Sequence, residues 1–267
     1  MAPDDVLLRR VRDLWETVSG AAVAFPPPGS PAAVATAPGS GLCPPGWVGI
    51  VTLDRSAIVT APDTAIAHSL RQALSALPTD ALTCADTVRS VVPVAEVLGP
   101  ARLAYVTEDA FRPVPYADGV ERLSAEGPDV TALLESVGPA DAQESGLAEV
   151  TSPVFALRER DGSSGCPNHP NDLGHSEAAP PLIAAAGYRH WPCGTAHLCV
   201  LTTPERRGQR LARRVASAAV AHALAAKLLP QWRARPPTSR RVARVLGFRE
   251  VGSQLSVRPE TPMAPHP

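Results

Sequence analysis

The stretch HLCVLTTPERRGQRLA, His197 to Ala212, decides the fold of this chain. Its first residues are mostly apolar and Pro204 ends the run, a pattern typical of a buried strand bounded by a turn. From Gln209 to Leu229 no glycine or proline interrupts an alanine-rich sequence, which predicts a long helix. A turn that leads into a helix directs backbone N–H groups and the positive end of the helix dipole at one point. The stretch therefore predicts an anion site, and phosphate suits such a site.

Arginine side chains crowd this predicted turn. Arg206, Arg207 and Arg210 lie within five residues, and guanidinium groups pair well with phosphate oxygens. From Glu205 to Arg249 there are eleven arginines, one lysine and one acidic residue, a net charge of +11. The whole 267-residue chain has a net charge of −1, so the remainder carries −12. This asymmetry indicates a polyanionic ligand. Coenzyme A fits, and nucleic acid is the alternative, although the segment has few aromatic rings.

Residues Arg207 to Ala212, RGQRLA, resemble motif A of the GNAT superfamily, the acyl-CoA-dependent N-acyltransferases. The family pattern is Q/R-x-x-G-x-G/A after a strand, and Arg210 stands where the central glycine is expected. A second segment, SRRVARVLGF, Ser239 to Phe248, resembles the closing helix of the family with its Leu-Gly-Phe. The resemblance covers about residues 128–258.

The resemblance implies that acyl-CoA lies along the motif strand and at the turn after it. Pantetheine would pair with the strand backbone, and a backbone N–H there would polarise the thioester oxygen. The phosphates would lie at the turn and the helix start. The coenzyme-binding residues that we expect are Cys199, Val200, Leu201, Thr202, Arg206, Arg207, Gly208, Gln209, Arg210, Leu211 and Ala212.

Acyl transfer to an amine also needs a base and a proton donor. Many family members have a tyrosine donor at the position of Ala243, so Ser239 is the nearest hydroxyl and our candidate donor, with a helix cap as the structural alternative. His197 lies on the motif strand and histidine titrates near neutrality, which makes it a candidate base. A purely structural histidine is the alternative. Glu159, at the end of an earlier predicted strand, is a further candidate base.

The fold class that we expect is α+β, with a GNAT-like mixed central sheet flanked by helices and preceded by a smaller α/β lobe. The N-terminal lobe would span residues 1–127, with a Pro/Gly/Ala-rich loop at 20–46. The acyl-CoA-binding domain would span 128–258, with an inserted loop at 161–181, and residues 259–267 would form a loose tail.

The function that we expect is transfer of an acyl group, most simply acetyl from acetyl-CoA as co-substrate, to a small amine. The alternative is a GNAT-like coenzyme A-binding or regulatory module without transferase activity. We expect no metal, although Cys166, His169 and His175 in the inserted loop keep a zinc interpretation open. We expect no nucleic-acid or membrane partner. Five cysteines, and no signal peptide or apolar run of about 20 residues, indicate a cytoplasmic protein with free thiols. The oligomeric state stays open.

Overall fold

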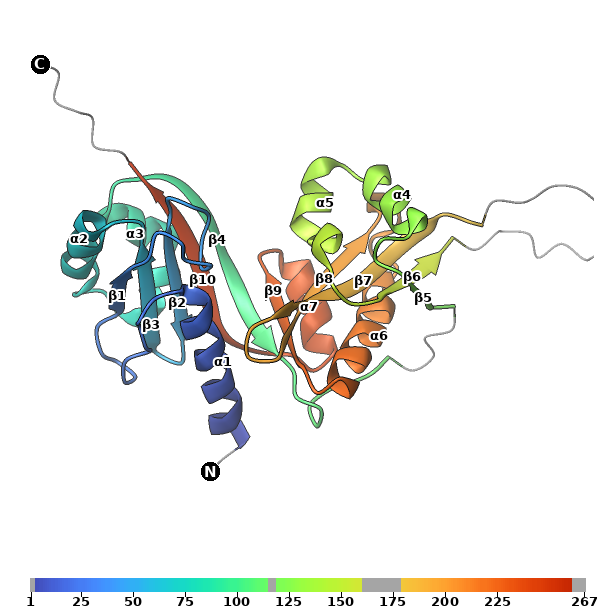
Figure 1. Cartoon of the computed structure of the whole chain (residues 1–267), viewed down its shortest axis with the longest axis horizontal. Coiled ribbons are helices and arrows are strands. Elements are labelled where there is room, and N and C mark those ends of the chain that lie inside the picture. Colours follow the sequence, from blue (N-terminus) through green and yellow to red (C-terminus); the bar gives the residue numbers. More distant parts are fainter. Residues whose placement is uncertain (1–2, 115–118, 160–178, 261–267) are drawn as a thin grey trace, which may run out of the picture. The chain divides into compact units, whose positions relative to one another are not determined.

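The fold is α+β, as the sequence predicted (Figure 1). The computed structural model describes residues 3–114, 119–159 and 179–260. The chain divides into two compact units, each assembled from segments that are distant in sequence. The first combines residues 1–111, 191–195 and 231–267, and the second combines residues 112–190 and 196–230.

The first unit has a mixed sheet with the strand order β1-β3-β2-β10-β4-β9. β1 and β3 are parallel and the other pairs are antiparallel, with β10 between β2 and β4. The elements are α1 (Pro3–Ser19), β1 (Ala33–Thr36), β2 (Val48–Leu53), β3 (Ser56–Ala61), α2 (Thr64–Leu74), the 3₁₀ helix η1 (Thr79–Thr83), α3 (Ala85–Val91), β4 (Val94–Tyr105), β9 (Leu229–Ala234), α7 (Pro237–Val245) and β10 (Arg249–Pro259).

The core of the first unit contains residues from both the N-terminal and the C-terminal parts of the sequence. Ile50 and Val59 from β2 and β3 share one buried cluster with Leu70 of α2 and with Leu255 and Val257 of β10. Because β10 pairs with β2 and β4, the C-terminal strand belongs to this unit. The domain boundary between residues 127 and 128 stays a prediction. The compact units described here are defined by contacts in space, and each contains several segments of the sequence.

The second unit has the strand order β8-β7-β6-β5 (Figure 1). α4 packs on one face, where Val130 and Leu133 meet Val154, Leu182 and Leu201, and α6 lies on the opposite face. The elements are β5 (Glu121–Leu123), α4 (Pro128–Ser136), α5 (Pro139–Ser145), the 3₁₀ helix η2 (Leu147–Glu149), β6 (Val154–Arg158), β7 (Leu182–Trp191), β8 (Thr195–Thr202), the 3₁₀ helix η3 (Pro204–Arg206) and α6 (Leu211–Ala225).

Local sequence signals locate several boundaries correctly. The short apolar run VFALR predicts a strand over residues 154–158, and β6 has these bounds. Aspartate is a residue type that commonly caps helices, and the Asp63 carboxylate accepts a hydrogen bond from the Ile66 N–H at 2.8 Å at the start of α2. Glycine commonly follows the end of a helix, and Gly247, just after α7, has a left-handed φ of 94°.

Other expectations were wrong. The loop at 20–46 contains β1, which pairs with β3. The helix expected over Gln209–Leu229 is confined to Leu211–Ala225, because Arg210 and Lys227 have left-handed φ angles of 63° and 62°. The helical spacing of Val242, Val245 and Leu246 predicts that all three point inward from α7, but Val245 is 37% exposed.

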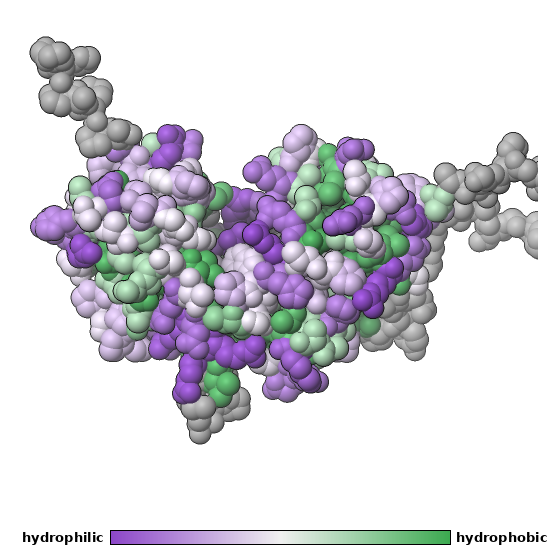
Figure 2. Space-filling view, in the orientation of Figure 1, coloured by the Kyte–Doolittle hydropathy of each residue, from purple (hydrophilic) through white to green (hydrophobic). Residues whose placement is uncertain are grey.

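The face shown in Figure 2 mixes hydrophilic and hydrophobic residues. The large apolar residues exposed within the described ranges, Val6, Val91, Leu98 and Val245, lie on four different elements. No helix in those ranges is long and apolar enough to cross a membrane. The inserted loop lies almost entirely outside the described residues, together with Cys166, His169 and His175. Within the described part of the chain, no group of three or more His, Cys, Asp or Glu side chains could hold a metal ion.

Candidate functional site

The predicted strand, turn and helix are present as β8, residues 203–210 and α6. Pro204 has no N–H for a sheet ladder, and β8 ends at Thr202. The Thr203 N–H still donates to the Ile183 carbonyl at 3.0 Å, which ties the start of the turn to β7. The turn then passes through η3 and two left-handed residues, Gly208 and Arg210, before α6 begins.

Arg210 is the N-cap of α6, with φ 63° and ψ 14°, and it makes no side-chain cap to the helix. This is the position where the family pattern has glycine. The conformation is one that glycine adopts freely and that other residues adopt at a steric cost. At the position of the family glycine the chain therefore has a backbone conformation that glycine would adopt without steric cost.

The start of α6 differs from that of α2 in the first unit. At α2, the Asp63 carboxylate occupies the N-terminus and accepts the Ile66 N–H. At α6, no acidic residue lies in the first turn and no side chain caps the helix within the described residues. The first N–H groups of a helix lack partners within it, so the α6 start can accept an external anion.

Two of the three predicted phosphate ligands already have carboxylate partners. Arg207 Nη2 lies 2.8 Å from Asp141 Oδ2 on α5, and Arg206 forms an ion pair with Glu159 just after β6. These four side chains are between 36% and 52% exposed. Sequence reasoning missed Asp141, because an acidic residue in a first helical turn resembles an ordinary favourable interaction with the helix dipole.

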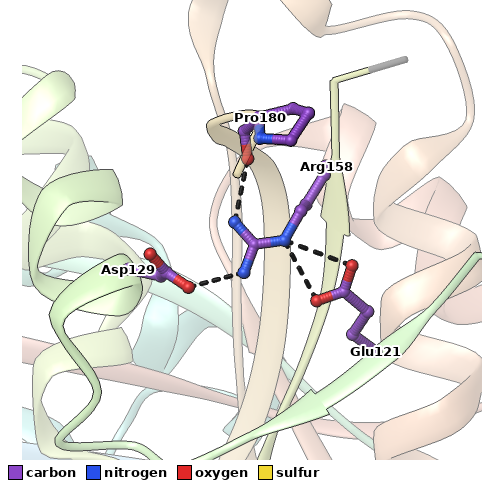
Figure 3. Close-up of polar contacts among 4 residues, drawn as sticks. All are labelled: Glu121, Asp129, Arg158 and Pro180. Carbon is purple, nitrogen blue, oxygen red and sulfur yellow. Dashed lines mark hydrogen bonds and ion pairs between the residues drawn. The ribbon is translucent and has the colours of Figure 1, made fainter. Parts of the chain in front are cut away.

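The end of β6, where Glu159 follows, is held by Arg158 (Figure 3). Its guanidinium donates to Glu121 of β5 at 3.1 Å, to Asp129 of α4 at 2.5 Å and to the Pro180 carbonyl at 2.8 Å. Hydrogen bonding to Asp129 raises the pKa of Arg158, which keeps it charged. This cluster fixes the strand end from which Glu159 reaches Arg206.

The side chains of β8 alternate between the two faces of the sheet. Cys199 lies close to Gly146, since a Cβ on that glycine would be 3.1 Å from Sγ, and Leu201 packs in the α4 cluster. His197 shares their side of the strand and is half-buried. Near the end of β8, Thr202 Oγ1 is buried and has no hydrogen-bond partner among the described residues.

The candidate proton donor Ser239 lies inside α7, whose N-cap is Pro236. The predicted cap role of Ser239 was wrong. Its hydroxyl accepts a hydrogen bond from Trp232 Nε1 at 3.0 Å. Ala243, at the position where many family members have tyrosine, is buried. Ser239 belongs to the first compact unit, and His197 and Glu159 belong to the second.

The strand, turn and helix of this α+β protein form a site that can bind an anion. The turn carries clustered arginines and left-handed residues, and the helix after it starts without a side-chain cap. Residues 193–253 match the model of a family described as GNAT acetyltransferase. The matched segment contains β8, the turn, α6, β9 and α7, and it confirms the GNAT resemblance that the RGQRLA motif predicted.

Solved structures of GNAT proteins resemble the chain more distantly. A putative GNAT-family acetyltransferase from Novosphingobium aromaticivorans is 22% identical, with a TM-score of 0.41 over 63% of this chain and 68% of that one. A GNAT-family acetyltransferase from Colwellia psychrerythraea is 14% identical, with a TM-score of 0.44 over 75% of each chain. A tandem GNAT protein from the clavulanic acid biosynthesis pathway is 11% identical, with a TM-score of 0.41 over 97% of each chain. Comparison with curated protein sequences gave no match.

Proposed function

We propose that this chain is an acyl-CoA-dependent N-acyltransferase that moves an acyl group, most simply acetyl, to a small amine. The observation that carries the proposal is the uncapped start of α6 beside Arg206, Arg207 and Arg210, inside the segment that matches the acetyltransferase family. Coenzyme A would place its phosphates there and its pantetheine along Cys199–Thr202. The remaining predicted coenzyme contacts, Gly208, Gln209, Leu211 and Ala212, form the turn and the first helical residues.

The reaction forms a bond between the amine nitrogen and the thioester carbon and breaks the carbon–sulfur bond. The amine loses one proton and the departing thiolate gains one. We propose His197 as the base, because imidazole is suited to proton transfer near neutral pH, and Glu159, which pairs with Arg206, as the alternative. Ser239 accepts a hydrogen bond from Trp232, and a hydroxyl that accepts still has its own proton to donate. We propose a cytoplasmic enzyme with a small-molecule acceptor.

Binding and turnover test the proposal separately. Calorimetry with coenzyme A should show that Arg206→Ala/Arg207→Ala binds more weakly than the wild type by about 1–3 kcal/mol, because charge-assisted contacts are lost. Arg189→Ala is a matched control, since Arg189 pairs with Glu149 on the same unit but outside the motif. Equal affinity in the double variant and the control would place the phosphates elsewhere.

The second candidate function is a module that binds coenzyme A without transferring acyl groups. Ala243 favours it, because a buried methyl group cannot protonate a thiolate. Release of free thiol from acetyl-CoA in the presence of a panel of amines separates the two functions. Amine-dependent release supports the transferase, whereas binding without any release favours the module.

A further inference from the structure

The two carboxylates paired with the turn arginines come from different elements of the second unit. Asp141 lies in the first turn of α5, and Glu159 follows β6. Neither is a sequence neighbour of the turn, and each reaches one of two adjacent arginines. The pairs therefore place two negative charges beside the arginines where a diphosphate would place its own.

In both pairs, a ligand anion can replace the carboxylate at the arginine. Their side chains are at least 36% exposed, and exposed ion pairs contribute little net stability. α5 has seven residues and none of them is buried, so little packing holds Asp141 against Arg207. Glu159 is held more firmly, because Arg158 fixes the end of β6 (Figure 3).

We infer that Glu159 and Asp141 are built-in counter-anions that a diphosphate ligand must displace, so that they determine the donor affinity of this turn. The inference rests on the proposed function, because it takes the diphosphate to be that of coenzyme A. A ligand with a single negative charge cannot pair with both guanidinium groups in place of the two carboxylates. A diphosphate has several charged oxygens and can pair with both. The two acidic residues thus act as specificity-determining groups for the donor.

The test measures coenzyme A binding by calorimetry in the wild type, Glu159→Gln, Asp141→Asn and the double variant. Binding is the readout because Glu159 is also a candidate base. Each single change should tighten binding about two- to fivefold, the range that an exposed ion pair supplies, and the double variant should tighten it further. Unfolding curves establish that each variant is folded.

Glu205→Gln is the matched control. Glu205 lies in the same turn, is exposed, and forms no ion pair with the described residues. Its removal deletes the same charge without freeing an arginine, so it should tighten binding less than either paired acid does. Tight binding that is equal in the wild type, the control and the double variant would overturn the counter-anion inference alone. If coenzyme A binds to none of these proteins, the proposed function is contradicted as well.

Discussion

At the scale of single residues, Arg210 combines a backbone that favours glycine with a cationic side chain. Its φ of 63° costs an ordinary residue about 1–2 kcal/mol, while glycine pays about 0.5–1 kcal/mol in chain entropy. Arg210→Gly should therefore raise the free energy of unfolding by up to about 1 kcal/mol in urea denaturation. Arg210→Ala is the control, since it removes the guanidinium but keeps the strained backbone.

The same two variants show whether the Arg210 side chain binds phosphate. If only the backbone matters, Arg210→Gly should bind coenzyme A at least as tightly as the wild type. If the guanidinium binds phosphate, both variants should bind more weakly by a similar factor. An Arg210→Gly protein that is less stable than Arg210→Ala would contradict the strain argument.

At the scale of elements, the half-buried His222 of α6 contacts β7 through its side chain. His222 Nδ1 lies 2.9 Å from the Tyr188 hydroxyl, and its ring packs against Phe155 at 5.4 Å between centroids. Burial lowers the pKa of His222, and the charges of Arg122 and His190 lower it further. The unfolded chain therefore binds a proton at higher pH than the folded chain does. The stability that the neutral ring contributes is present above about pH 6.5 and is lost as the pH falls below it.

This pH dependence can be measured by urea unfolding at pH 7.5 and at pH 5.5. His222→Gln should lose less stability between these values than the wild type, because glutamine does not titrate. His68→Gln is the control, since His68 is exposed on α2. If His222→Gln and the wild type lose the same stability on acidification, another group is responsible.

At the scale of the whole molecule, the last described strand completes the first unit. β10 lies between β2 and β4, and Leu255 and Val257 are fully buried in its core. Burial of two such side chains contributes about 3–6 kcal/mol, a large share of the roughly 5–15 kcal/mol that stabilise a typical domain. A chain ending at Phe248 should therefore lose cooperative unfolding of this unit, as measured by calorimetry.

A chain ending at Glu260 is the matched truncation, because it keeps all of β10. It should unfold like the full chain. Cooperative unfolding of the first unit in the chain ending at Phe248 would show that this unit does not depend on β10.

The sequence by itself determined the local structure of this protein. The apolar run that becomes β8, the breaking effect of Pro204, the Asp63 cap and Gly247 after α7 all act over a few residues, so they are visible without the fold. The RGQRLA motif belongs to this class. It lies inside residues 193–253, which match the acetyltransferase family, and its strand, turn and helix are contiguous in the chain.

Only the tertiary structure decided which distant residues meet. It paired β10 with β2 across about 200 residues, gave Ser239 a hydrogen bond with Trp232 in place of a cap, and brought Asp141 and Glu159 to the turn arginines. Propensity and capping depend on neighbours within a helical turn, whereas these contacts depend on how the elements pack. Even the left-handed Arg210 is of this kind, because its own preference opposes the backbone that the surrounding strand and helix impose.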